Sequence, residues 1–355
     1  MRSFPRFKKN SPPRVPLNAV EVLHQTARRL GLEAFGIAPV QAPAHAADLH
    51  DWLSQSFQGE MAWMARDPET RTDPKKYDPS ARSILVAGLS SRQTAPPPRR
   101  GRIAAYAQGA DYHDFLREKL EILARETITP WGGSHRTCVD TSPLLEKPLA
   151  ALAGLGWQGK NTLLIHREHG PWLLLGVLLT DLEFPSDVAS SDHCGHCTRC
   201  LDACPTQAFP RPYVLDARRC LAYLTIENPG SIPEEFRPLV GDRLFGCDEC
   251  LEVCPWNRHA GNAREIKLTP QPRPDLREML TWDDARFRTE FRGTPIFRLK
   301  RNRWLRNVAV VLGNIGTPDD LPALEKCSED KDALVRDHAA WAIARIHERA
   351  QQRNG

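Results

Sequence analysis

Eight of the ten cysteines in this chain of 355 residues lie between positions 194 and 254. The first group, HCGHCTRCLDACPTQ at 193–207, has the spacing C-x2-C-x2-C-x3-C-P. In that spacing three thiolates hold one [4Fe-4S] cluster and the fourth binds a neighbouring cluster. The second group, LFGCDECLEVCPW, repeats only the end of this pattern, with Leu244 where its first cysteine would stand. This segment therefore has to fold around the metal that its thiolates bind.

Counting ligands completes two cluster sites. Two [4Fe-4S] clusters need about eight thiolates, and Cys220 in DARRCLAYL supplies the one that the two groups lack. We assign one cluster to Cys194, Cys197, Cys200 and Cys254, and the other to Cys204, Cys220, Cys247 and Cys250. A pair of zinc sites is the alternative, because C-x2-C knuckles also bind zinc. The repeated x3-Cys-Pro ending favours iron and sulfur.

Composition limits the remaining possibilities. A net charge of +4 gives no general argument for nucleic-acid binding, which would need a local basic patch. The most apolar run, PWLLLGVLLTDLEF, is too short to cross a bilayer, and the basic N-terminal stretch lacks the apolar segment of a secretion signal. We expect a cytoplasmic, monomeric protein without membrane contact, in which thiols stay reduced and bind metal.

Alternating helical and strand patterns predict a mixed α+β fold. Helices are expected at 19–31 and 111–127, where apolar residues recur at helical spacing. Strands are expected at 83–89, at 102–109, and twice within 161–179 around Gly170. The expected units are a flexible extension at 1–17, an α/β domain at 18–185, a ferredoxin-like two-cluster domain at 186–265, a linker at 266–297 and a helical module at 298–355.

The helical module has three expected helices joined by short turns, a pattern typical of HEAT-like repeats. Thr317 is its expected helix cap, and Cys327 falls in register with core leucines. The basic run RLKRNRWLR precedes these helices. Its five cations allow two interpretations, a solvated helix face or a contact with phosphates, and they are Arg298, Lys300, Arg301, Arg303 and Arg306.

Several motifs together resemble the epoxyqueuosine reductases, over about residues 18 to 350. They are GEMAWMAR, YAQGADYH, VDTSPLLEKPLAALAGLGWQGKNTLL, the eight cysteines, AYLTIENPGSIPEEFRPLVGDR and RWLRNVAVVLGN. The resemblance implies a cobalamin-binding α/β domain similar to that of reductive dehalogenases. It also implies an oxidoreductase that reduces epoxyqueuosine to queuosine at the wobble position of tRNA, with electrons passing through two [4Fe-4S] clusters to cob(I)alamin. A low-potential donor of flavodoxin or ferredoxin type would supply them.

The resemblance also carries residue roles to this chain. Asp140 in VDTSP matches the family's proton donor, for which its pKa would have to be raised; without the resemblance, a helix N-cap before Pro143 is the simpler interpretation. The expected cobalamin contacts are Trp63, Asp140, Lys160, Asn161, Leu164, Leu175 and Ala222. The expected tRNA contacts are Thr225, Ile226, Glu227, Lys300, Arg301 and Arg303. Cys138 is expected to be a small buried residue.

Two other protein classes remain in view at this stage. A cobalamin-dependent reductive dehalogenase would share the cofactors, but such enzymes are typically exported on twin-arginine signals, and none is visible here. A non-catalytic electron carrier with two clusters would have no use for a bound corrin. Retention of cobalamin on purification would distinguish the carrier from the enzyme.

Overall fold

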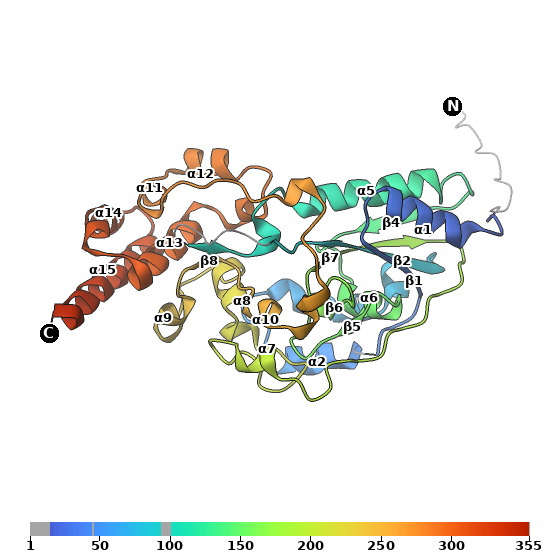
Figure 1. The fold of residues 1–355 in the computed structure, drawn as a ribbon, viewed down its shortest axis with the longest axis horizontal. Helices are drawn as coiled ribbons and strands as arrows, with labels where there is room; N and C mark the ends of the chain where they lie inside the picture. The colour runs from blue at the N-terminus through green and yellow to red at the C-terminus, as the bar shows by residue number, and fades with distance from the viewer. Residues whose placement is uncertain (1–14, 45, 94–100, 355) are drawn as a thin grey trace, which may run out of the picture.

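The computed structural model describes residues 15–354, apart from residue 45 and residues 94–100. Most of the predicted extension at 1–17 therefore lies outside the described residues. The central feature is an antiparallel sheet in the order β1-β2-β7-β4, seen on the right of Figure 1. Its strands are β1 Ala34–Pro39, β2 Ser83–Ser90, β4 His135–Cys138 and β7 Leu173–Thr180.

Helices cover both faces of this sheet, which explains why β2 is buried along its whole length. Helices α1 Ala19–Arg29 and α5 Tyr112–Glu126 pack on one face, where Leu85, Leu116 and Leu178 share a core. Helix α6 Glu146–Leu152 packs on the other face against Ile84, Leu149 and Val177. Alternate residues of one strand thus enter opposite cores, as the two-residue period of a strand requires.

The predicted elements of this domain are mostly confirmed. The helices at 19–31 and 111–127 and the strand at 83–89 are present as α1, α5 and β2. The segment 161–179 forms β6 Leu164–Ile165 and β7, and Gly170 makes the turn with φ +58° and two backbone hydrogen bonds to His166.

The strand predicted at 102–109 is wrong over most of its length. Only β3 Arg102–Ile103 is a strand, and it pairs in parallel with β8 Arg243–Phe245. The chain then turns into a 3₁₀ helix at Ala105–Ala107, because the carboxylate of Asp248 accepts a 2.7 Å hydrogen bond from the Ala105 N–H. A partner about 140 residues away therefore ends this strand.

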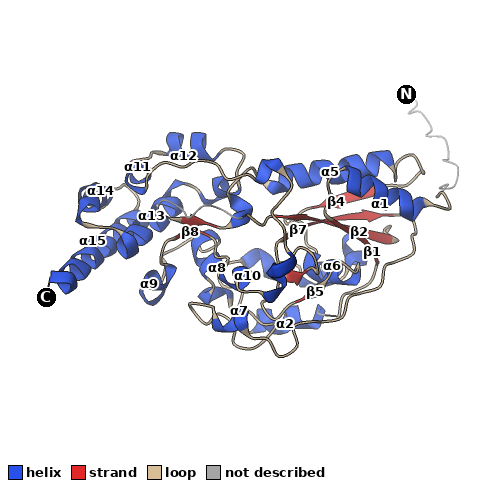
Figure 2. Cartoon of the chain, viewed as in Figure 1, coloured by secondary structure: helices blue, strands red, loops and turns tan. Residues whose placement is uncertain are grey.

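Short helices separated by turns make up the cysteine-rich part of the chain, which lies below the sheet in Figure 2. They are α7 Arg199–Asp202, α8 Leu221–Ile226, α9 Arg237–Val240 and α10 Glu249–Glu252. The remaining short elements of the N-terminal half are α2 Ala46–Ser54, α3 Pro68–Thr72, α4 Pro74–Tyr77 and β5 Trp157–Gln158.

The C-terminal helices form a module on the left of Figure 1, in which α13 and α15 pack side by side. Its helices are α11 Leu276–Leu280, α12 Asp284–Phe291, α13 Arg301–Ile315, α14 Leu321–Cys327 and α15 Ala333–Asn354. The segment predicted as a linker at 266–297 contains α11 and α12, and their Met279 and Phe291 belong to the same core as Trp304 of α13. The predicted cap at Thr317 and the buried Cys327 are confirmed.

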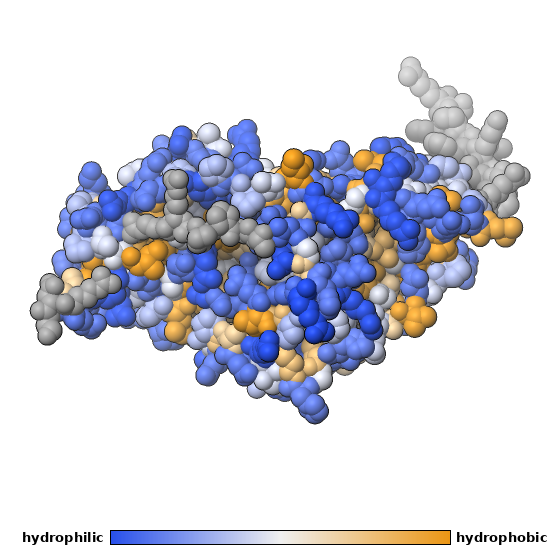
Figure 3. Space-filling view, viewed as in Figure 1, coloured by the Kyte–Doolittle hydropathy of each residue, from blue (hydrophilic) through white to orange (hydrophobic). Residues whose placement is uncertain are grey.

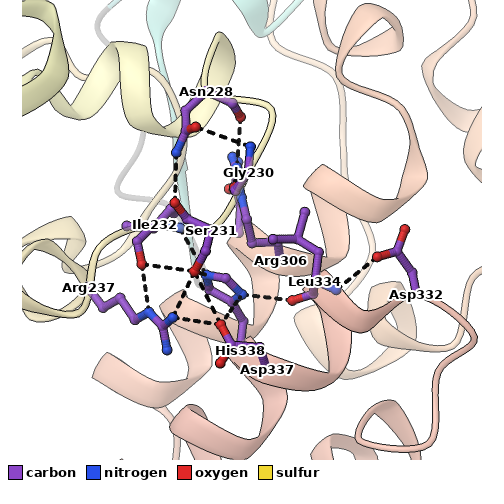
Figure 4. Close-up of polar contacts among 11 residues, drawn as sticks. Asn228, Gly230, Ser231, Ile232, Arg237, Arg306, Asp332, Leu334, Asp337 and His338 are labelled. Atoms are coloured by element: carbon purple, nitrogen blue, oxygen red, sulfur yellow. Dashed lines mark hydrogen bonds and ion pairs between the residues drawn. The ribbon is translucent and has the colours of Figure 1, made fainter. Parts of the chain in front are cut away.

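A buried polar network joins this module to the segment that follows α8 (Figure 4). Arg306 has no exposed surface and donates hydrogen bonds of 2.9, 2.8 and 2.6 Å to the carbonyl oxygens of Leu224, Asn228 and Gly230. The ring Nε2 of His338 accepts a 3.1 Å hydrogen bond from the Ile232 N–H. The network therefore fixes the chain next to Cys220, the N-cap of α8, against the C-terminal helices.

The outer surface in the view of Figure 3 is mostly hydrophilic, with hydrophobic residues scattered over it. Among the described residues no helix has both the length and the apolar character that a membrane span needs.

Candidate cluster sites and active site

Four of the cysteines surround one pocket of about 220 Å³, and they are the four assigned to the first cluster: Cys194, Cys197, Cys200 and Cys254. Cys194 and Cys197 precede α7 and Cys200 lies within it, whereas Cys254 follows α10, which contacts α7. The contact between these two helices thus brings together thiols that are far apart in the chain. The three other cysteines of these runs, Cys204, Cys247 and Cys250, do not line this pocket.

The donor set of this pocket is four thiols, which suits an iron-sulfur cluster and also the zinc ion of the alternative interpretation. The indole of Trp157 is buried and packs in the same small core as Cys194 and Cys254, and burial raises the pKa of the Cys194 thiol. The degree to which its sulfurs are shielded from solvent is one of the factors that set the reduction potential of a cluster.

The second set of cysteines is also gathered in one place. Burial raises the pKa of the Cys250 thiol well above its usual value, and the nearby Cys220 and Cys247 add to the shift. Burial likewise raises the pKa of Cys220, with Cys204 contributing. Because thiols must lose their protons to bind iron, cluster assembly here releases protons.

Two residues predicted to contact cobalamin support the cluster loops. Lys160 donates hydrogen bonds of 2.6 and 3.1 Å to the carbonyl oxygens of Gly195 and Cys197. Asn161 is buried and donates a 3.1 Å hydrogen bond to the carbonyl oxygen of Cys250. The stretch between β5 and β6 therefore connects the sheet domain to both cluster sites.

Asp140 lies in the loop between β4 and α6 and has φ +58°, a conformation that non-glycine residues adopt at a cost. Its backbone N–H donates a 2.7 Å hydrogen bond to Glu146 Oε1. Helix α6 begins only at Glu146 and has Leu145 at its N-cap, so the simpler interpretation of Asp140 as a helix cap is wrong. Its side chain is 57% exposed and can meet a bound molecule.

The carboxylate of Asp140 is the end of a row of charged groups. Its Oδ2 lies 3.0 Å from Nε2 of His113, and Nδ1 of the same ring lies 2.5 Å from Oδ1 of Asp111. Arg298, which follows α12, pairs with Oδ2 of Asp111 at 2.9 Å. The hydrogen bond from His113 lowers the pKa of Asp140, whereas the role of proton donor would need it raised.

Two neighbours of Asp140, rather than Asp140 itself, have a raised pKa. Burial raises the pKa of Glu146 to about 8. The two carboxylates beside His113 outweigh its burial and raise its pKa to about 8. Sequence reasoning did not assign His113 or Glu146, although both lie inside the motifs YAQGADYH and VDTSPLLEKP; their long-range partners could not be read from those motifs.

Further groups connect Asp140 to the cluster ligands. The charge of Lys147 interacts with Glu146, Asp140, Cys220 and Cys250. Trp63, an exposed aromatic side chain, stacks with Arg71 at 5.4 Å, and Arg71 in turn interacts with Asp140. Lys147 therefore lies within electrostatic range both of Asp140 and of two ligands of the second cluster site.

The other predicted contacts have varied surroundings. Leu164 and Leu175 are buried against α6, and Ala222 is half-buried on α8. Thr225 is fully buried and its hydroxyl accepts from the Gly246 N–H. Ile226 is half-buried, whereas Glu227 is exposed and interacts with Asp140.

The residues of the basic run also differ in their burial and in their contacts. Arg301 pairs with Asp330, and Arg303 donates to the carbonyl oxygen of Ile226 at 3.0 Å. Because Arg306 is fully buried, neither a solvated face nor a phosphate contact describes it. Lys300 is exposed, and contacts of this run with tRNA stay a prediction.

Comparisons with known proteins agree with this architecture. Residues 71–141 match the family model "Epoxyqueuosine reductase QueG, DUF1730", and residues 193–257 match the "4Fe-4S double cluster binding domain". An epoxyqueuosine reductase of Xanthomonas campestris is 42% identical over 93% of this chain and 96% of its own length.

Two solved structures extend the comparison. A crystal structure of epoxyqueuosine reductase with an epoxyqueuosine-modified tRNA stem loop superposes with a TM-score of 0.86, at 32% identity, over 92% of this chain and 90% of that one. An epoxyqueuosine reductase from Bacillus subtilis, in which an aspartate catalytic loop is swung out of the active site, superposes with a TM-score of 0.83, at 31% identity and the same coverage. The predicted mixed fold is confirmed, and the chain belongs to the epoxyqueuosine reductase family.

Proposed function

We propose that this chain reduces the epoxide of epoxyqueuosine in tRNA to the alkene of queuosine, with loss of the oxygen as water. The names of its relatives and the stem-loop complex of one of them support this activity. One observation carries the proposal for this chain itself: Lys147 lies in electrostatic range of Asp140 and also of Cys220 and Cys250. A carboxylate that can meet a substrate and ligands of an electron-transfer cluster are thus neighbours.

Electrons would enter at the cluster of Cys194, Cys197, Cys200 and Cys254, because these cysteines line a pocket that also includes the exposed Arg258 and His193. They would then pass to the second cluster, whose ligands Cys220 and Cys250 interact with the same Lys147 as Asp140 does. A low-potential protein of flavodoxin or ferredoxin type would supply them. Reduction of the epoxide takes two electrons and two protons, so the site must also deliver protons.

Cobalamin is the cofactor that the proposal requires, and the residues around Asp140 fit it. Trp63 exposes 44% of its surface, and an exposed aromatic side chain beside a charged site is available to cover a large ring. The corrin would be lined by Trp63, Asp140 and Ala222. The cluster loops next to it would be positioned by Lys160 and Asn161. Support for Lys160 and Asn161 from the sheet domain would come from Leu164 and Leu175. When bound and reduced, cobalamin supplies a strong nucleophile for the epoxide carbon.

The residues of the chain then have separate tasks. Asp140 would meet the epoxide oxygen and protonate it as it leaves. Glu227 would border the modified nucleotide, together with the backbone of Thr225 and Ile226. Lys300 would contact the phosphates of the stem, with Arg301 and Arg303 behind it. A nucleotide in an anticodon loop leaves its stack at little cost, which suits chemistry on the wobble base.

An anaerobic assay tests the proposal. Reconstituted protein, cobalamin, a low-potential reductant and tRNA carrying epoxyqueuosine are incubated, and the released nucleosides are analysed by mass. We expect the epoxide nucleoside to lose one oxygen with the native chain. Asp140→Asn should retain iron and cobalamin but lose turnover, whereas Asp114→Asn, an exposed aspartate of α5, should turn over normally. Persistence of the epoxide with the native chain would overturn the proposal.

A further inference from the structure

A continuous row of polar contacts leads from the C-terminal module to the carboxylate of Asp140. Arg298 Nη2 lies 2.9 Å from Asp111 Oδ2, Asp111 Oδ1 lies 2.5 Å from His113 Nδ1, and His113 Nε2 lies 3.0 Å from Asp140 Oδ2. The ring of His113 thus has a carboxylate at each nitrogen, and Arg298 Nη1 also lies 3.0 Å from Nδ1. Only 8% of its side chain is exposed, so water has little access to it.

The local backbone fixes the ring in this place. Asp111 is the N-cap of α5 and accepts from the His113 N–H, and the Asp111 N–H itself donates to the carbonyl oxygen of Gly293 at 2.8 Å. Tyr112 stacks on the imidazole with ring centroids 4.0 Å apart. His113 therefore cannot swing away from Asp140 without losing its ring contacts with Asp111 and Tyr112.

The charges around His113 favour its protonated form. Asp111 and Asp140 face it from α5 and from the loop before α6, and Arg298 faces it from η7 Pro295–Leu299. Further charged and titratable groups interact with Asp140 or Asp111 rather than with the ring itself. They are Arg71, Tyr106, Tyr112, Glu146, Lys147 and Glu227. The hydrogen bond from His113 keeps the pKa of Asp140 low, so near neutral pH the proton of this pair resides on the imidazole.

We propose that His113 is the proton reservoir of the site and passes its proton to the substrate through the Asp140 carboxylate. The inference rests on the proposed function. In this step the Nε2–H bond of the imidazolium breaks and an O–H bond forms on Asp140 Oδ2; Asp140 then gives the proton to the epoxide oxygen. His113 is left neutral with its proton on Nδ1, held by Asp111, and takes a new proton from solvent by way of the exposed Asp140 carboxylate. The electrons come from the clusters, and the second proton of the reaction comes from solvent.

This assignment makes His113 a positioning residue that acts through Asp140, and it explains how an aspartate with a lowered pKa serves as an acid. Asp111 keeps the Nδ1 proton in place while Nε2 gives up its own. Arg298 Nη2, 2.9 Å from Asp111 Oδ2, supports Asp111 with an opposite charge. The proton supply of the sheet domain would thus depend on a residue that enters from the C-terminal half of the chain.

The test compares pH–rate profiles of the holoenzyme with those of His113→Gln. We expect the native rate to fall as the pH rises through about 8. His113→Gln should be slower by about 100-fold, the lower range for loss of a proton-transfer group, and its rate should not fall in that pH range. His135→Gln is the matched control, because His135 pairs with Glu121 of α5 at 3.0 Å rather than with Asp140. This variant should keep the native profile.

A second measurement does not depend on turnover. In the oxidised holoenzyme, NMR signals of His113, assigned by their loss in His113→Gln, should titrate near pH 8 and shift to lower pH in Asp111→Asn. Native rate and profile in His113→Gln, or titration of His113 near 6.5, would overturn the inference. If the native enzyme does not reduce epoxyqueuosine at all, the proposed function fails, and the titration still decides whether His113 holds the proton.

Discussion

Glu146 accepts a 2.7 Å hydrogen bond from the backbone N–H of Asp140, the residue whose φ of +58° is unfavourable for an aspartate. A non-glycine residue in this conformation costs about 1–3 kcal/mol, so a specific contact has to hold it. Burial raises the pKa of Glu146 to about 8. Glu146 is therefore largely a neutral acid near pH 7, and one of its oxygens can accept the hydrogen bond without placing a second negative charge beside Asp140.

Removing this acceptor should loosen the Asp140 loop. In Glu146→Ala we expect turnover to fall about 10-fold, because a lost hydrogen bond of about 1–1.5 kcal/mol changes the population of the active loop conformation by that factor. Glu146→Gln retains an oxygen acceptor and should stay within about 2-fold of the native rate. Single-turnover rates with epoxyqueuosine tRNA measure both. Equal rates for the alanine and glutamine variants would contradict this role.

Double substitutions test which cysteines share a cluster. The native holoprotein should contain about eight irons, four in each [4Fe-4S] cluster. Cys194→Ser with Cys254→Ser removes two ligands of one pocket, and about four irons should remain. Cys194→Ser with Cys204→Ser removes one ligand from each site, and both clusters should be lost or depleted.

The opposite pattern of iron loss would show that the four cysteines of the first group, at 193–207, bind one cluster among themselves. In that case Cys194→Ser with Cys204→Ser would keep half of the iron, and Cys194→Ser with Cys254→Ser would lose nearly all. Iron and sulfide analysis after anaerobic reconstitution gives the count, and metal analysis of the same samples for zinc tests the alternative metal directly.

The sequence predicts those parts of the fold that depend on local patterns. The buried strand β2 and the helices α5 and α13 follow from apolar spacing alone, and the cluster ligands follow from spacing and counting. The end of β3 is set by its pairing with β8 and by Asp248, which no window around residue 102 contains. Long-range partners therefore decide what local patterns leave open.

The same limit applies to the site. VDTSP indicates Asp140, but the pKa of Asp140 depends on His113, 27 positions earlier, and on the distant Arg298. The basic run suggests a surface patch, yet Arg306 within it is buried. Its aliphatic neighbours on α13 give no sign of the carbonyl groups that Arg306 meets, because those belong to α8 and to the chain that follows it.

Arg306→Met tests the importance of that buried network (Figure 4). The substitution leaves the carbonyl oxygens of Leu224, Asn228 and Gly230 without their donor, at a cost of about 1–3 kcal/mol for a buried group that loses its partner. We expect the free energy of unfolding to fall by about 3 kcal/mol in total. Chemical denaturation of the holoprotein, followed by cluster absorbance and by circular dichroism, measures this loss.

Lys331→Met is the matched control. Lys331 pairs with Asp284, but its side chain is 74% exposed, and exposed ion pairs contribute about 1 kcal/mol or less. Similar losses for both variants would mean that the Arg306 network does not anchor the segment after Cys220. We also expect Arg306→Met to lose iron from the second cluster first, because Cys220 lies at the start of that segment.

His338 predicts how the stability of the protein depends on pH. Its side chain is fully buried, its Nε2 accepts from the Ile232 N–H and its Nδ1 lies 2.7 Å from the carbonyl oxygen of Leu334, so the neutral ring fits. Burial lowers its pKa from 6.5 to about 4, and Arg237 and Arg306 add to the shift. The folded state thus keeps His338 neutral over a range in which the unfolded chain takes up a proton.

The sign of the effect follows from this proton uptake. Above pH 6.5 neither the folded nor the unfolded state binds the proton, so the contribution of His338 to stability is constant. Between pH 6.5 and 4 only the unfolded state gains the proton. The free energy of unfolding therefore falls by up to about 3 kcal/mol as the pH is lowered through this range. In His338→Gln, whose amide oxygen can still accept from Ile232, this part of the pH dependence should disappear. His347→Gln, an exposed histidine of the same helix α15, should keep it. Denaturation midpoints measured from pH 7.5 to 4.5 compare the three proteins, and a slope in His338→Gln as steep as in the native protein would assign the acid sensitivity to other groups.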